Sequence, residues 1–124
     1  MNKNTINQQM QFAYEALAEA GIADVSGNIS KTFRGQISSF GAALTMGSLL
    51  PAIAFFSNDG GSSVQRSKLM AAILLVLQKN GKAKKDVKTL FDYAKSGNED
   101  ACKDEILNAA ISLKLAMNLY NLVK

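Results

Sequence analysis

The sequence predicts an all-α fold, a single compact bundle of five or six helices that spans residues 1–124. Apolar residues recur at steps of three and four along most of the chain, which is the helical period. Short segments rich in glycine, serine and asparagine separate these stretches, and no segment alternates apolar and polar residues as a half-buried strand does. The composition agrees, because 48% hydrophobic and 19% charged residues in a chain of 124 suit one globular domain.

The first two helices are predicted from capping residues and glycine breaks. Thr5 and Gln8 have the spacing of a capping box, and Gly21 is a natural stop for the helix that follows. Its inward positions are predicted to be Ile6, Met10, Ala13, Tyr14 and Leu17. A second helix is predicted to be capped by residues 26–28 and to end near Gly47. Its inward positions are predicted to be Ile29, Phe33, Ile37, Phe40 and Leu44.

Residues 35–58 contain no charged side chain, which raises the question of a membrane span. Ser48 is predicted to cap a separate third helix, Leu49–Phe56. Pro51 then falls in its first turn, where the missing N–H has no intrahelical partner to lose. The densest apolar run is therefore residues 49–56, far shorter than the roughly twenty residues of a spanning helix. The sequence favours two bundle helices over a membrane span.

The fourth helix is predicted to follow a second capping box, formed by Ser62 and Gln65. It contains an uninterrupted apolar run, Leu69–Leu77, and Asn80-Gly81 ends it. An amphipathic surface helix would interrupt such a run with polar residues, so this helix is predicted to be buried on most sides.

Two more helices complete the bundle. A shorter one is predicted over Lys84–Lys95, and the last follows Ser96 and Glu99, which have the spacing of a third capping box. Glu99 and Asp100 lie favourably at the positive end of the helix macrodipole. One apolar stripe of the last helix consists of Ile106, Ala110, Leu113, Met117 and Tyr120. A second consists of Leu107, Ile111, Leu115, Leu119 and Leu122, and the remaining side is neutral, with Asn108, Ser112, Asn118 and Asn121.

The net charge of +4 is distributed unevenly. Residues 1–62 carry three basic and four acidic groups, whereas residues 63–124 carry eleven basic and six acidic groups. Five lysines lie between Lys79 and Lys88 around the Asn80-Gly81 turn, and such a patch can attract phosphate backbones. The alternative is that they are simply solvated helix ends and a loop. The candidate nucleic-acid-binding residues are Lys31, Arg34, Arg66, Lys68, Lys79, Lys82, Lys84, Lys85 and Lys88.

The second helix has an outer face of small, uncharged residues where a surface helix would carry lysine and glutamate. These residues are Gly35, Ser38, Ser39, Ala42 and Thr45. Two interpretations remain open. The face is a protein interface, because interface cores are depleted of charge, or the helix lies in the centre of the bundle.

The residue types needed for catalysis are sparse. The chain has no histidine, the commonest general base and metal ligand, and its one cysteine, Cys102, has no histidine to activate it. A lone cysteine also fits a reducing cytoplasm. The carboxylates of Glu99, Asp100, Asp104 and Glu105 cluster, but an acidic helix N-terminus needs no metal to explain it. The sequence therefore predicts no enzyme activity, no cofactor and no metal site.

Residues 74–95 have the outline of a helix-turn-helix, which keeps a DNA-binding regulator as an alternative function. The would-be recognition helix presents only Asp86, Lys88, Thr89, Asp92 and Lys95 outward. Arg, Asn and Gln, which read base edges best, are absent, so sequence-independent phosphate contact is favoured over base reading. A third alternative is a small helical adaptor without a nucleic-acid role.

The whole chain resembles the small subunit of the Cmr module, the type III-B CRISPR effector complex. The resemblance is carried by "FRGQISSFGAALTMGSLLPAIAFF", residues 33–56. Family members have an aromatic residue followed by arginine, then apolar steps, a helix break and an apolar segment ending in phenylalanine. Phe33-Arg34, Gly47-Ser48-Leu49 and Phe55 fall at matching spacings. The chain departs from the family in its break, in the proline expected near Gly41, and in a closing helix that is poor in arginine.

This resemblance implies a non-catalytic role in antiviral defence. Copies of the subunit would stack as the inner filament of the complex. They would pack against the backbone subunits and the large polymerase-like subunit, and line the channel that holds crRNA and target RNA. Uncharged helix faces would form the protein interfaces and lysines would contact phosphates. No membrane association is implied.

Overall fold

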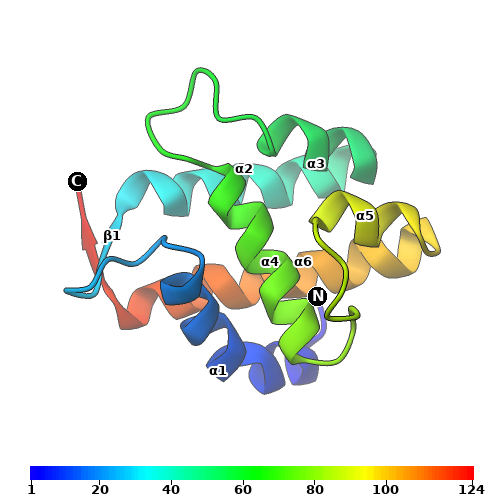
Figure 1. Ribbon diagram of the computed structural model, residues 1–124, viewed down its shortest axis with the longest axis horizontal. Helices are drawn as coiled ribbons and strands as arrows, with labels where there is room; N and C mark the ends of the chain where they lie inside the picture. Colours follow the sequence, from blue (N-terminus) through cyan, green and yellow to red (C-terminus); the bar gives the residue numbers. More distant parts are fainter.

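The computed structural model describes residues 1–124 (Figure 1). Its fold consists of six α-helices and a very short two-stranded parallel sheet. The predicted all-α bundle is confirmed. None of the helices combines the length and the apolar character needed to cross a lipid bilayer. The elements are α1 (Lys3–Glu19), β1 (Asn28–Ser30), α2 (Lys31–Met46), α3 (Leu49–Phe56), α4 (Ser67–Lys79), α5 (Leu90–Lys95), α6 (Glu99–Ala116), the 3-10 helix η1 (Met117–Leu119) and β2 (Asn121–Val123).

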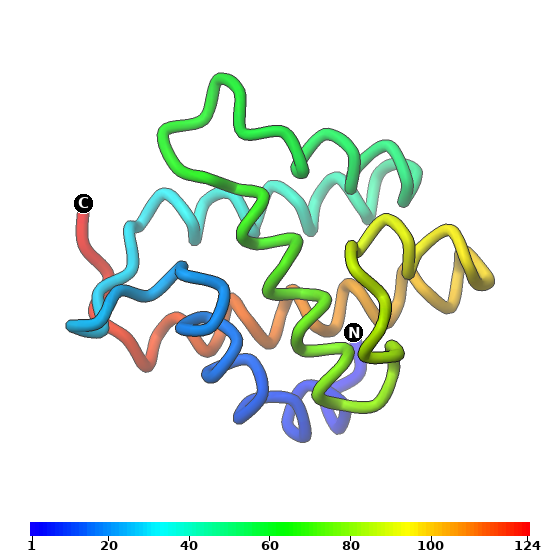
Figure 2. The backbone as a smooth tube through the Cα atoms, in the orientation of Figure 1, coloured from blue at the N-terminus to red at the C-terminus, as the bar shows by residue number.

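The central element is α4, which crosses in front of α2 and α6 in Figure 2 and packs against α1, α3, α5 and α6. The predicted burial of its apolar run is confirmed for all but two residues, since Ala71 is exposed and Leu75 is partly exposed on the outer side. Burying one large aliphatic side chain contributes about 1.5–3 kcal/mol, so this helix anchors the core. Its buried side chains are Leu69, Met70, Ala72, Ile73, Leu74, Val76 and Leu77.

The break between the second and third helices lies where the sequence predicts it. The α2 helix ends at Met46, and α3 spans Leu49–Phe56 with the proline in its first turn. The Ser48 side chain makes no capping hydrogen bond. Instead, the backbone N–H of Leu49 donates to a carboxylate oxygen of Glu99 at 3.4 Å, which ties α3 to the start of α6.

All three predicted capping boxes are wrong, because neighbouring polar residues cap the helices instead. The Asn2 side chain caps α1 by accepting from the N–H of Thr5, and Asn98 caps α6. At α4, the Asp59 carboxylate accepts from the backbone N–H and the hydroxyl of Ser67, at 2.8 and 2.9 Å. The α2 helix starts later than predicted, after Ser30, since residues 28–30 form a strand.

The predicted helix over Lys84–Lys95 is wrong in its first half. Residues 84–89 are irregular, and α5 covers only Leu90–Lys95, capped by the Thr89 hydroxyl. Ten residues, 80–89, therefore separate α4 from α5.

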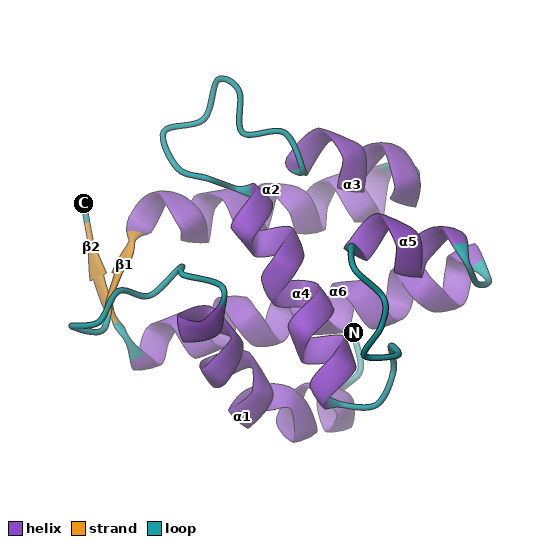
Figure 3. Ribbon diagram, viewed as in Figure 1, coloured by secondary structure: helices purple, strands orange, loops and turns teal.

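The C-terminus forms a strand that the sequence does not predict. After Ala116 the chain passes through η1 into β2, which pairs in parallel with β1 (Figure 3). Leu122 lies opposite Ile29, which is fully buried. The Asn121 side chain donates to the Asn28 side chain at 2.8 Å. The last helical stripe therefore ends sooner than the apolar spacing predicts.

Candidate functional site

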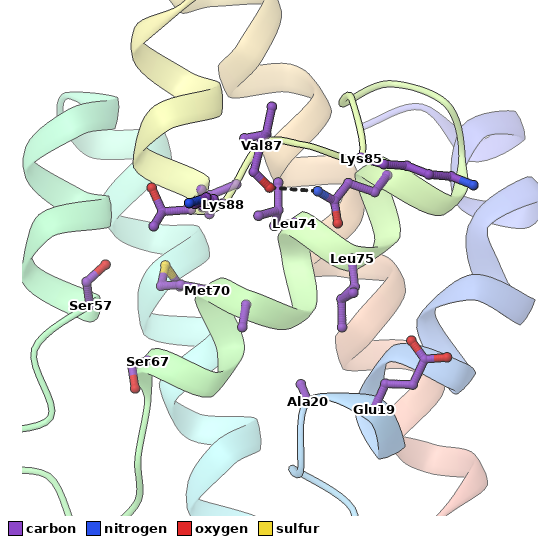
Figure 4. A pocket seen from close by; sticks show the side chains of 14 residues that line it. Glu19, Ala20, Ser57, Ser67, Met70, Leu74, Leu75, Lys85, Val87 and Lys88 are labelled. Atoms are coloured by element: carbon purple, nitrogen blue, oxygen red, sulfur yellow. Dashed lines mark hydrogen bonds between the residues drawn. The ribbon is translucent and has the colours of Figure 1, made fainter.

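The lysine turn, defined here as residues 80–89, is held in one shape by α4. The carbonyl oxygen of Leu77 accepts from the N–H groups of Lys82 and Ala83, at 2.8 and 3.1 Å, and this closes the end of the helix. The amide nitrogen of Gln78 donates to the carbonyl oxygens of Lys84 and Val87, at 3.1 and 2.9 Å. Figure 4 shows the bond to Val87 as a dashed line. The turn is therefore preorganised.

Four lysines of this turn are exposed and none makes an ion pair. They are Lys82, Lys84, Lys85 and Lys88. The only acidic residue within the turn is Asp86, so the segment has a clear positive excess. Unpaired ammonium groups on a fixed backbone can bind phosphates without first losing another partner.

The other basic candidates near α4 form ion pairs or hydrogen bonds with other parts of the protein. The Nζ of Lys79 lies 3.2 Å from a carboxylate oxygen of Glu15 and 3.0 Å from one of Glu19. The hydrogen bond that Lys79 donates to Glu19 is the main cause of a raised Lys79 pKa. Desolvation opposes this effect, and the hydrogen bond donated to Glu15 adds to it. Lys68 donates from Nζ to the carbonyl oxygen of Gly21 at 3.2 Å.

Arg66 is the most deeply engaged of these candidates. It is only 8% exposed, and its Nε donates to the carbonyl oxygen of Asn58 at 2.7 Å. Its guanidinium carbon lies 4.4 Å from the centre of the Phe55 ring and 5.4 Å from that of Phe56. Such stacking is a cation–π contact. Arg66 therefore holds the loop after α3 against the start of α4.

The structure does not bring the remaining two candidates to the lysine turn. Lys31 is exposed and Arg34 is half-buried, both in the first turn of α2 beside β1. In Figure 1 this end of α2 and the lysine turn lie on opposite sides of the molecule.

A groove, called here the α4 groove, runs beside the lysine turn and encloses about 480 Å³. Figure 4 shows its floor, formed by Met70, Leu74 and Leu75 on α4, between the end of α3 and the end of α1. Lys85 and Lys88 line the groove, and Lys82 and Lys84 do not. The groove was not found by sequence reasoning, because it depends on the irregular path of residues 84–89.

The uncharged face of the second helix is on the outside of the molecule. Gly35, Ser38, Ser39, Ala42 and Thr45 are all exposed. The hydroxyls of the two serines and the threonine donate to carbonyl oxygens one turn earlier, at 3.1, 3.1 and 2.9 Å. The face is therefore not buried in the centre of the bundle, which was one of the two interpretations left open above.

The two apolar stripes of α6 differ in burial. Ile106, Ala110, Leu113 and Met117 of the first stripe are buried. The second stripe is partly outside: Leu107 and Ile111 line a shallow hollow with Ser38 and Gly41 of α2, and Leu115 is 44% exposed. The side predicted to be neutral is divided: Asn108 and Ser112 are buried, whereas Asn118 and Asn121 are exposed. The hydroxyl of Ser112 donates to the buried Gln9 side chain of α1 at 3.1 Å. A largely uncharged surface thus extends from α2 across to α6, with Lys114 as the one charged residue that lines the hollow.

Groups with catalytic or metal-binding chemistry do not gather in the structure. Cys102 is buried at 6% exposure, and this burial raises the pKa of its thiol. No group of three or more histidine, cysteine, aspartate or glutamate side chains is placed to hold a metal ion.

Comparison with known proteins returned no match to any protein-family model, curated protein or solved structure.

Proposed function

We propose that this protein is a non-catalytic structural subunit of a cytoplasmic ribonucleoprotein, and that it is the small subunit of a type III-B CRISPR complex. Its partners would be the backbone and large polymerase-like subunits, further copies of itself, crRNA and target RNA, and its role would be antiviral defence. The proposal rests on the resemblance carried by residues 33–56 and on the surfaces described above.

The observation that carries the proposal is the exposed, uncharged face of α2. Twelve residues, 35–46, contain no charged side chain, although six of them are exposed: the five named above and Met46. Exposing an uncharged helix surface to water costs free energy only where the surface is apolar. The small residues of this face instead favour an interface because they let the backbone of a second protein approach closely. The adjacent Leu107 and Ile111 add apolar area. This combination supports a protein interface.

The lysine turn supports a second contact, with RNA phosphates. Its four unpaired lysines offer charge, and Asn80 is the one base-reading side chain of the arginine, asparagine and glutamine type among its ten residues. The expected binding is therefore sensitive to salt and indifferent to sequence. Arg66, Lys68 and Lys79 are left out of this contact, since each is already engaged in the fold.

The alternative of a helix-turn-helix regulator is less well supported. That motif joins its two helices by a turn of three or four residues. Here ten residues separate α4 from α5, and α5 has only six residues. A footprint on one specific duplex would nevertheless decide for this alternative.

The interface is tested by coexpression with the other subunits of such a complex, followed by copurification. Ser39→Glu places a charge in the middle of the uncharged face, and we expect it to reduce copurification at least about tenfold, since a buried unpaired charge costs several kcal/mol. Ala18→Glu adds the same charge at an exposed position of α1 and serves as the matched control. Equal assembly of both variants would remove this face from the interface.

The RNA contact is tested with a single-stranded oligouridylate of about twenty nucleotides. We expect the double variant Lys82→Glu, Lys84→Glu to bind more weakly and to lower the slope of log K against log salt by about 1.4, the value for two lost phosphate contacts. The control is Lys3→Glu with Lys124→Glu, which changes the net charge equally at other exposed positions. An equal loss of RNA affinity in the two double variants would indicate an effect of net charge and not a binding site at the lysine turn.

A further inference from the structure

The α4 groove has the shape and lining of a peptide-binding groove. Its volume of about 480 Å³ lies within the range of about 300–1,000 Å³ that is typical of ligand sites. It continues into a second hollow that shares Glu19, Leu75, Gln78 and Lys85 and extends to Phe12. The two hollows together follow the outer side of α4 from Ser67 to Lys79, a distance of about 20 Å at the helical rise per residue.

The floor of the groove is aliphatic. Met70 and Leu74 form it together with Leu75, and the exposed Ala71 leaves room between them. No aromatic residue lines the main hollow, and Phe12 in the second hollow is the one ring on which a nucleic-acid base could stack. Methionine and leucine on a helical wall are instead typical of grooves that accept the apolar face of an amphipathic helix.

The charges at the rim favour an acidic ligand. Lys85 and Lys88 line the groove and have no acidic partner. Glu19 on the opposite rim and Glu15 in the second hollow share the ammonium of Lys79, at 3.0 and 3.2 Å, so three lysines face two carboxylates along the two hollows. The backbone of the turn that carries the two lysines is fixed by the bonds from Gln78, so only the lysine side chains need to be ordered on binding.

We propose that the α4 groove docks an acidic amphipathic helix of a partner protein, with leucine-like side chains on the floor and carboxylates at Lys85 and Lys88. A second copy of this chain does not supply such a helix. Its own acidic segment, the start of α6, has Cys102 and Ile106 buried in the core, and the partly exposed Leu107 and Ile111 that follow lie in the hollow beside α2. This use of Lys85 and Lys88 leaves Lys82 and Lys84 free for RNA.

The test is fluorescence anisotropy with a labelled synthetic peptide of about fourteen residues, with leucine at helical steps of three and four and glutamate elsewhere. We expect saturable binding, and at least about tenfold weaker binding of the matched peptide in which lysine replaces every glutamate. Lys85→Glu with Lys88→Glu is expected to weaken binding at least about tenfold. Lys82→Glu with Lys84→Glu carries the same charge change outside the groove and is expected to change it by less than about threefold.

A neutral variant separates the groove from general electrostatic attraction. Ala71→Trp fills the groove from an exposed position and is expected to weaken peptide binding about tenfold while leaving oligouridylate binding unchanged. If that variant does not fold, as judged by circular dichroism, the smaller neutral variant Ala71→Gln replaces it. Absence of saturable binding, equal loss in both lysine pairs, or loss of RNA binding in the Ala71 variant would each overturn the proposal. The last outcome would assign the groove to nucleic acid.

Discussion

Gln78 is a single side chain on which the shape of the candidate site depends. It lies near the end of α4, is half-buried, and uses one amide nitrogen to hold two carbonyl oxygens of an otherwise irregular segment. In the sequence it is an ordinary polar residue near a helix terminus. Its role is visible only when the path of residues 84–87 is known.

We expect Gln78→Ala to lower the free energy of unfolding by about 1–2 kcal/mol, because two partly buried carbonyl oxygens lose their donor. Amide hydrogen exchange in residues 82–88 should become faster than in the rest of the chain, since the turn opens locally. Urea unfolding and exchange mass spectrometry measure the two effects. Gln8→Ala, at an exposed position of α1 where the side chain makes no hydrogen bond, is the control and should change stability little. Unchanged exchange in the turn would show that Gln78 does not hold it.

At the scale of the elements, apolar periodicity was a good guide and capping was a poor one. The limits of α3 and the burial of α4 follow from long apolar runs and one proline. Few other structures could accommodate these two features together. Caps depend on which of several nearby polar residues reaches the helix end, and that choice is made by tertiary packing. Asp59 reaches the start of α4 because Arg66 folds the loop back against Phe55.

The strand pair was beyond local prediction for a related reason. Each strand has only three residues, and the paired residues Asn28 and Asn121 lie 93 positions apart in the sequence. A pattern that short carries no usable period. The same limit applies to the candidate site. The positions of the basic residues are read directly from the sequence, but which of them are paired, buried or free depends on partners distant in the sequence.

The cap of α4 can be tested directly. We expect Asp59→Ala to destabilise the protein by about 1–2 kcal/mol, because the first turn of α4 loses its carboxylate acceptor. Ser62→Ala removes the residue that the sequence predicted as the cap, and should cost only a few tenths of a kcal/mol. Urea unfolding of the two variants gives the comparison. A larger effect at Ser62 than at Asp59 would contradict the observed cap.

For the whole molecule, the two candidate contact surfaces are separate. The uncharged surface lies on α2 and the adjoining side of α6, and the lysine turn and α4 groove lie along α4, which crosses in front of those helices in Figure 1. One surface can therefore be occupied without covering the other. This arrangement suits a subunit that joins proteins on one side and holds a charged ligand on another.

Global stability should depend on alkaline pH through Tyr93, which packs in the contact between α5 and α6. Burial raises the pKa of its phenol from 10.0 to about 12, with smaller contributions from Cys102 and Glu105 nearby. A folded pKa above the unfolded one means that the stabilising contribution is fully present below pH 10. It is lost as the pH rises from 10 towards about 12, because the unfolded chain gives up the proton first.

We expect the urea midpoint of the natural protein to fall over this pH range, and that of Tyr93→Phe to fall less, because phenylalanine has no proton to lose. At pH 7 the two proteins should be within about 1 kcal/mol of each other, since the phenol is protonated in both folded and unfolded states. Burial raises the pKa of Tyr120 as well, so the variant should retain part of the dependence. Identical pH dependence in the two proteins would show that the Tyr93 phenol titrates alike in the folded and unfolded chain, and would place the alkaline sensitivity elsewhere.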